Sequence, residues 1–319
     1  MEAAATPSPL RRSRHVGDRI GDGVLYGLTA LAALTCVLVV AAIVWKVIQG
    51  SWPAIQEFGL SFLWTGEWDP VSSQFGAFQF ILGTLVTSLG ALLLAAPLSI
   101  AIGLFLSELA PPLVRGPVGT LVEMLAAVPS VVVGLWGIFV LAPFMRDHVE
   151  PFLNQTLGFL PIFSGEPSGI GMLPAIVVLA IMTIPITSSI CRELFLSVPR
   201  ELEDAARPRR HAVGDGCVVV PSVKGGVVAA VILGLGRALG EAIAVTQTIG
   251  NFVPLQRSLF APGDTLASRV ANQYQGAVSN IQVASLIYLA LILLVITFVT
   301  NVAAQRIVRR FELQRAGGD

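Results

Sequence analysis

An arginine and a glutamate lie inside one of the most apolar stretches of the sequence. Arg237 and Glu241 are four residues apart in the segment 227–249, which is built mainly from Ala, Val, Ile, Leu and Gly. A helical segment would place the two side chains one turn apart on the same face. Arg237 would then lie about 15 Å from the start of the segment, because a helix rises 1.5 Å per residue.

A charge at this depth needs a reason. Insertion scales give a cost of ~2.5–3.5 kcal/mol or more for an ionised side chain at the centre of a membrane helix. In one interpretation Arg237 and Glu241 form a neutral pair that holds helices together. In the other, Arg237 is a cationic waypoint for an anion, because the planar guanidinium donates paired hydrogen bonds to an oxyanion. Glu241 would then orient Arg237 or weaken its hold on the ion.

Two glycines accompany the charged pair. Gly236 and Gly240 form a G-x-x-x-G motif, and small residues at this spacing let two membrane helices approach closely. With Gly234 the segment also nearly matches the dinucleotide-binding fingerprint, but no strand precedes it, so we expect no nucleotide site here. The two glycines are therefore predicted to serve helix packing.

The composition places this segment in a membrane protein. Of 319 residues, 54% are hydrophobic and only 13% are charged, whereas soluble domains carry about 25% charged residues. Spans of about 20 apolar residues must be helical, because lipid offers the backbone no hydrogen-bond partners. We therefore predict an all-α, polytopic membrane protein. Its six expected spans are residues 23–45, 80–106, 121–144, 169–190, 227–249 and 283–302.

The arginines predict the orientation of the spans. Fifteen of the basic residues fall in the N-terminal tail, the loops after the second and fourth spans and the C-terminal tail, against four on the other side. Positive charge concentrates on the cytoplasmic side, so both termini are expected there. The predicted domains are a tail at 1–22, a membrane domain at 23–308 with a cytoplasmic loop at about 191–226, and a tail at 309–319.

Other charged and reactive residues suggest no further chemistry. Glu123 lies near the cytoplasmic end of the third span and is expected to snorkel to the interface. The three cysteines form no disulfide framework, and the histidines show no metal-ligand spacing. The sequence also has no phosphate-binding loop and no catalytic set of residues. We therefore predict no metal, no cofactor, no nucleic-acid partner and no enzymatic activity, with the first span an uncleaved helix rather than a signal peptide.

Several motifs together resemble a known family. The residues Glu203, Asp204, Ala205 and Ala206, with Pro221 downstream, look like the EAA loop of ABC-importer permeases. The stretch GGVVAAVILGLGRALGEAIAV at 225–245 resembles the phosphate-specific permeases of the PstC kind. The similarity continues in the segments 73–77, 83–89 and 104–111, so it covers nearly all of the expected spans.

This resemblance implies a fold and a set of partners. The fold would be that of a type I ABC-importer permease in the bacterial inner membrane. A second homologous permease would complete the pore, an extracytoplasmic binding protein would deliver inorganic phosphate, and cytoplasmic subunits would bind ATP. Residues 203–206 would form the coupling helix that docks on the ATPase. The family associates the residues matching Arg237 and Glu241 with phosphate transport.

Three other functions remain open at this point. The same architecture could carry another oxyanion, such as sulfate or molybdate. A channel or membrane scaffold would need no ATPase. A membrane-embedded enzyme is a third possibility, which the absence of a catalytic constellation disfavours.

One segment departs from the family pattern. Arg210 stands where the EAA loop has a glycine, Pro221 arrives two residues early, and Pro208 would tend to break a coupling helix. Codons can be chosen for residues 207–216 whose +1 frame reads Ala-Leu-Gly-Ala-Thr-Arg-Trp-Glu-Thr-Val, which is the family's usual type of sequence. The alternatives are a compensated frameshift, by sequencing error or by mutation, and a functional variation.

We predict that the nucleotide sequence of the gene spells this peptide in the +1 frame across codons 207–216. Sequencing the locus from genomic DNA checks it, because a sequencing error would disappear and a real lesion would persist. A gene in which neither neighbouring frame encodes the peptide would rule out the frameshift.

Overall fold

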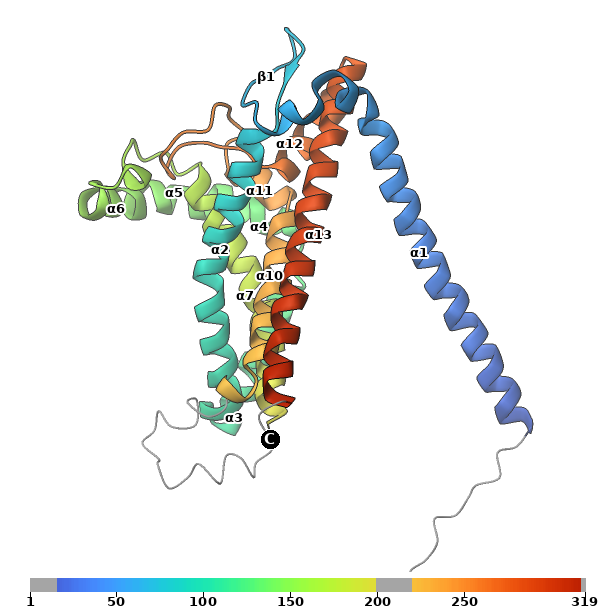
Figure 1. Ribbon diagram of the computed structural model, residues 1–319. Coiled ribbons are helices and arrows are strands. Elements are labelled where there is room, and N and C mark those ends of the chain that lie inside the picture. Colours follow the sequence, from blue (N-terminus) through green and yellow to red (C-terminus); the bar gives the residue numbers. More distant parts are fainter. Residues whose placement is uncertain (1–15, 199–219, 317–319) are drawn as a thin grey trace, which may run out of the picture. The chain divides into compact units, whose positions relative to one another are not determined.

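The computed structural model describes residues 16–198 and 220–316, with side chains described for 21–198 and 220–308 (Figure 1). The chain divides into two compact units, Met1–Gln49 and Gly50–Asp319. The first unit contains most of α1 (Val16–Phe58), a long and apolar helix that ends in the second unit. The helix already begins at Val16, inside the segment predicted as a tail.

In its described residues the second unit is mainly helical and contains one short hairpin. The strands β1 (Trp68–Asp69) and β2 (Gln74–Phe75) pair antiparallel. The main helices are α2 (Phe78–Leu104), α3 (Pro112–Ala126), α4 (Ser130–Trp136), α5 (Ala142–Phe144), α6 (Glu150–Leu157), α7 (Met172–Leu196), α10 (Lys224–Gly240), α11 (Ile243–Thr248), α12 (Leu266–Gln273) and α13 (Asn280–Ala316). The shorter pieces are η1 (Gly59–Leu63), η2 (Phe105–Leu109), η3 (Gly137–Leu141), η4 (Met145–Val149), η5 (Pro161–Phe163) and η7 (Tyr274–Gly276), of which η2, η3 and η4 are π-helical.

Five helical stretches of the described chain are long and apolar enough to cross a membrane. They are Gly21–Leu63, Phe78–Leu109, Ser130–Leu157, Met172–Leu196 and Asn280–Val308. The prediction of an all-α membrane protein is confirmed, whereas the count of six spans is not. The cytoplasmic loop predicted at 191–226 is shorter at both ends, because α7 continues to Leu196 and α10 begins at Lys224.

Two of the predicted spans are interrupted. The third was expected at 121–144, but α3 ends at Ala126 and α4 begins at Ser130. Pro129 stands in the gap; it has no N–H to donate, and it disfavours helical backbone at the residue before it. The fifth was expected at 227–249, but α10 ends at Gly240 and α11 starts at Ile243.

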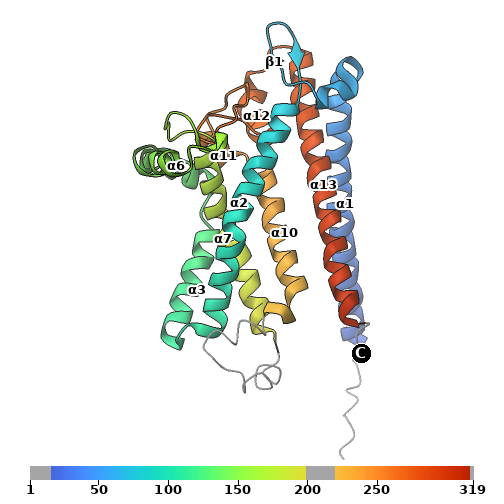
Figure 2. The same ribbon diagram turned by 60° about the vertical axis from the view of Figure 1, so that its left-hand side comes forward.

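The helix α7 is the centre of the second unit. Figure 2 shows it between α2 and α10, and it packs against both, as well as against α3 and α11. The contact face of α2 is made of small residues at helical spacing, among them the buried Thr87, Ala91, Ala95, Ser99 and Gly103. Small side chains let two helix backbones come close, which replaces the hydrophobic driving force that lipid does not supply.

The contact between α7 and α10 depends on Gly234. A Cβ atom at this position would lie 2.6 Å from Thr187 Oγ1 and 2.8 Å from Thr183 Cγ2. At Gly236 the nearest atom would be 3.5 Å away, and at Gly240 there is open space. The close approach within this chain is therefore made by Gly234, and the predicted packing role of Gly236 and Gly240 remains a prediction for a partner subunit.

We expect Gly234→Ala to lower the stability of the protein relative to Gly236→Ala. Both changes raise helix propensity by up to ~1 kcal/mol, but only the first adds a methyl group to an occupied space, which costs about 1–3 kcal/mol. Thermal unfolding of the two purified variants in one detergent measures the difference. Equal midpoints would show that Gly234 is not needed for the α7–α10 contact.

Candidate functional site

Arg237 and Glu241 stand on the two sides of a helix break. Arg237 lies in the last turn of α10, which ends at Gly240, and Glu241 has an extended backbone with ψ 117°. The Glu241 carboxylate accepts a hydrogen bond from the backbone N–H of Ala244 at 3.3 Å. Glu241, one residue before the N-cap Ala242, therefore binds an N–H in the first turn of α11, where negative charge is favourable. A continuous helix with both side chains on one face is not what the structure shows.

The Arg237 side chain is left without a partner of its own. In the part of the chain that the structure describes, no ion pair or hydrogen bond joins it to Glu241 or to any other residue. Arg237 is exposed, and so are Leu233 and Gly240 on the same helix. The structure therefore shows no Arg237–Glu241 pair in the described chain, and the role of the two residues stays a prediction. The cation instead belongs to a face of α10 that is open to an ion or a partner.

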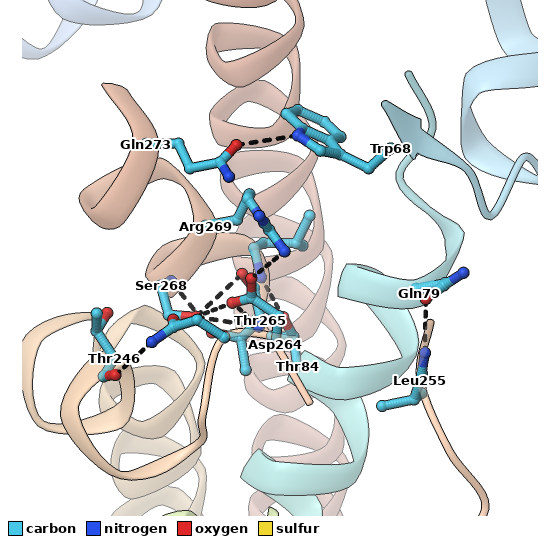
Figure 3. A network of polar contacts seen from close by, with 12 residues as sticks. Trp68, Gln79, Thr84, Thr246, Leu255, Asp264, Thr265, Ser268, Arg269 and Gln273 are labelled. Carbon is cyan, nitrogen blue, oxygen red and sulfur yellow. Dashed lines mark hydrogen bonds and ion pairs between the residues drawn. The ribbon is translucent and has the colours of Figure 1, made fainter. Parts of the chain in front are cut away.

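A buried ion pair that the sequence did not predict lies beyond α11 (Figure 3). Arg269 Nη2 is 2.7 Å from Asp264 Oδ2, and the side chains are 6% and 1% exposed. Burial raises the pKa of the Asp264 carboxyl, while the neighbouring guanidinium acts in the opposite direction. Charges taken out of water this far are stable only when they are paired and hydrogen-bonded.

Hydrogen bonds reach one oxygen of the Asp264 carboxylate. Its Oδ1 accepts from the Thr265 N–H at 2.8 Å and from the Ser268 hydroxyl. Thr265 and Ser268 also form a capping box at the start of α12, each side chain accepting from the other's backbone N–H. Thr84 of α2 accepts from the Leu266 N–H at 2.9 Å. The capped end of α12 is thus fixed to α2.

Aromatic rings cover the Arg269 guanidinium. Its central carbon lies 4.8 Å from the centroid of Phe80 and 5.8 Å from that of Trp68, distances at which a ring face attracts a cation. Trp68 in turn donates from Nε1 to Gln273 Oε1 at 2.9 Å. The network therefore ties the β1–β2 hairpin, α2 and α12 together, as Figure 3 shows.

The chain packs so closely at this point that only glycine fits. A Cβ atom at Gly83 would lie 2.0 Å from the backbone oxygen of Asp264. The segment between α11 and α12 also closes on α7, since Leu259 O accepts from the Leu173 N–H at 2.8 Å and Thr248 O from the Gly171 N–H at 3.0 Å. One end of α11 is therefore held by this network, and the other end begins at the break beside Arg237.

The sequence carried only a weak signal for this network. The order Asp264, Thr265, Ser268 is that of a helix N-terminus, and it stands outside every predicted span. The rings that cover Arg269 belong to Trp68 and Phe80, 201 and 189 residues earlier in the chain, so spacing alone could not join them to it. Arg269 was accordingly expected only as one of the basic residues on the outer side.

The structure also places the other residues singled out in the sequence. Glu123 forms an ion pair, since its Oε1 lies 3.4 Å from Arg192 Nη1, and this pair joins α3 to α7. The coupling residues Glu203, Asp204, Ala205 and Ala206 lie outside the described residues. Within the ranges that the structure describes, no group of three or more His, Cys, Asp or Glu residues could hold a metal ion.

Comparison with known proteins places this arrangement in a family. The family model described as binding-protein-dependent transport system inner membrane component matches residues 99–313, which include the helix break and the buried ion pair. The protein named phosphate transport system permease protein PstC of Pasteurella multocida is 43% identical over 290 residues, 89% of this chain and 90% of the relative. The chain belongs to the PstC-type branch of this family.

More distant proteins also resemble this chain. The probable phosphate transport system permease protein PstC of Methanocaldococcus jannaschii is 34% identical over 259 residues, 78% of this chain and 82% of the relative. A bacterial alginate ABC transporter solved with its periplasmic protein has a chain that aligns with a TM-score of 0.57 and 18% identity, over 92% of this chain and 97% of that one. At that identity the match shows the fold, and it confirms the predicted ABC-importer permease architecture.

We expect Arg269→Met to destabilise the protein by about 3–5 kcal/mol, because it leaves the Asp264 carboxylate buried without its cation. Adding Asp264→Asn to that variant should recover part of the loss. Thermal unfolding of the single and double variants measures this, with Arg257→Met at an exposed loop position as the control. A single variant as stable as the control would show that the ion pair contributes nothing.

Proposed function

We propose that the chain is the permease subunit of an ATP-driven phosphate importer, and that it forms half of the translocation pathway. The observation that carries the proposal is Arg237, an exposed and unpaired cation at a helix break inside an apolar segment. The proposal draws further support from relatives whose names are phosphate transport system permeases. Arg237 would be the point that the anion passes.

The physical argument is one of cost and fit. An unpaired guanidinium at membrane depth is costly, so such a residue is retained where an anion or a water-filled pathway compensates it. Guanidinium donates two parallel hydrogen bonds to an oxyanion. Transporters form substrate sites where a membrane helix is interrupted, and α10 is interrupted three residues after Arg237. Glu241, held at the start of α11, keeps a negative charge near the site and favours release of the anion.

The other components of the transporter would be separate subunits. A second, homologous permease would face the exposed side of α10, where Gly240 leaves open space for it. Cytoplasmic subunits would bind the ATP and grip the segment around residues 203–206, and an extracytoplasmic binding protein would deliver the substrate. Both termini would lie in the cytoplasm. This chain would need no cofactor and no ATP site of its own.

Two alternatives are separated by one experiment. Sulfate and molybdate offer the same tetrahedral set of oxygen acceptors, and a channel would work without ATP. Uptake of labelled inorganic phosphate into proteoliposomes that contain the whole complex is measured with ATP and without it, and with each competing anion. The proposal requires ATP-dependent uptake that excess phosphate suppresses and excess sulfate or molybdate does not. Uptake without ATP, or stronger suppression by sulfate or molybdate, would contradict it.

We predict that Arg237→Ala abolishes phosphate uptake while the complex still assembles, because the side chain makes no contact on which folding depends. The loss should exceed about 100-fold, the effect of removing a fully engaged charged hydrogen-bond donor. Uptake by proteoliposomes and co-purification of the other subunits are the two measurements.

Arg257→Ala provides the matched control, because Arg257 is another exposed arginine, in the loop before α12. It should transport at the rate of the unmodified protein. Normal uptake by the Arg237→Ala complex would reduce Arg237 to a structural role.

A further inference from the structure

A cavity of about 370 Å³ lies between α10 and α13. Its volume falls within the range of small-molecule sites. Most of its wall is apolar, but two amide side chains contribute to it. The lining residues are Ala229, Ile232 and Leu233 of α10 and Asn301, Ala304, Gln305 and Val308 of α13.

The cavity lies on the same face of α10 as Arg237. Residues 229, 233 and 237 are spaced by four, so they follow one stripe of the helix. Arg237 is thus one turn beyond Leu233, about 6 Å along the helix axis. Asn301 faces the same region, because a Cβ atom at Gly236 would lie 3.5 Å from its Oδ1. An anion that left Arg237 toward the Lys224 end of α10 would meet this cavity next.

The two amides form a pair on α13. Asn301 and Gln305 are four residues apart, and residues at this spacing share a helix face. In the described chain neither side chain makes a hydrogen bond. Their two N–H₂ groups are therefore available to a ligand that accepts hydrogen bonds. Gln305 is exposed and Asn301 is half-buried, which leaves a way in.

Neutral donors suit a site that an ion must leave. Passage through a pore requires binding that is favourable enough for entry and weak enough for exit, with several sites in succession. A guanidinium followed by two uncharged amides gives a strong site and then a weaker one. A second arginine in this position would hold the anion more tightly and slow its release.

We propose that the Asn301–Gln305 cavity is a second binding station for the transported oxyanion, on the side of Arg237 nearer to Lys224. The arginine distribution predicts that side to be cytoplasmic. The amide N–H₂ groups of both residues donate to the oxygens of the anion. The proposal rests on the proposed function, because it takes inorganic phosphate as the ion that arrives from Arg237.

Charged but nearly isosteric replacements test the station. Asn301→Asp and Gln305→Glu keep the size of each side chain and replace its donor with a negative acceptor, which repels an anion. We expect each to lower the initial rate of inorganic phosphate uptake by the reconstituted complex about tenfold, since like charges brought together are strongly unfavourable. Gln305→Leu should lower it less. Thr300→Val is the control, because Thr300 bonds to Ile296 O at 2.8 Å and does not line the cavity.

The results distinguish a failure of the second binding station from a failure of the proposed function. Wild-type uptake rates in Asn301→Asp and Gln305→Glu would overturn the station and leave the proposed function intact. If the unmodified complex takes up no phosphate, the proposed function fails as well. Gln305 is exposed, so its variants decide the matter even if those of Asn301 do not assemble.

A lipid phosphate group offers the same oxygens as a free phosphate ion. Vesicles made without anionic lipid distinguish the two sources. Free phosphate as the ligand predicts that Gln305→Glu lowers uptake to the same extent in both kinds of vesicle. An effect that disappears without anionic lipid would assign the cavity to a lipid headgroup and overturn the proposal.

Discussion

The unpaired charge of Arg237 inside an apolar helix is the constraint on which the rest of the structure depends. Helix packing does not require it, because no side chain in the described chain neutralises it. The helix that carries it ends three residues later, and Glu241 binds the backbone N–H of Ala244 in α11. A cation that costs energy and receives no internal compensation needs an external one.

The polar groups near α11 are of two kinds. The Asp264–Arg269 pair is buried and covered by rings, and one carboxylate oxygen of Asp264 accepts two hydrogen bonds. Arg237, Asn301 and Gln305 are only partly buried or exposed and have no internal partners. The helix α11 joins the two regions, because it begins beside the break that follows Arg237 and ends at the segment that leads to Asp264.

The class of protein and the presence of Arg237 in an apolar helix could be predicted from the sequence. The length of an apolar segment and a charged residue within it are local signals. The helix breaks were harder to predict. The one before Ser130 follows from Pro129, whereas the one at Glu241 depends on a side chain that bonds to its own backbone three residues on. The Asp264–Arg269 network could not be predicted, since Phe80 and Trp68 approach it only through the packing of α2 and the hairpin. The G-x-x-x-G spacing predicts packing at Gly236 and Gly240. It does not show that Gly234 is the glycine of α10 that contacts Thr183 of α7.

The most direct measurement places a cysteine at the decisive position. Arg237→Cys is made in a chain with Cys36, Cys191 and Cys217 replaced, and the reconstituted complex is treated with small thiol reagents that are either cationic or anionic. If an anion passes this point, phosphate should slow the labelling, and the cationic reagent alone should restore part of the phosphate uptake. Labelling that phosphate does not affect, or equal recovery with the anionic reagent, would contradict the account.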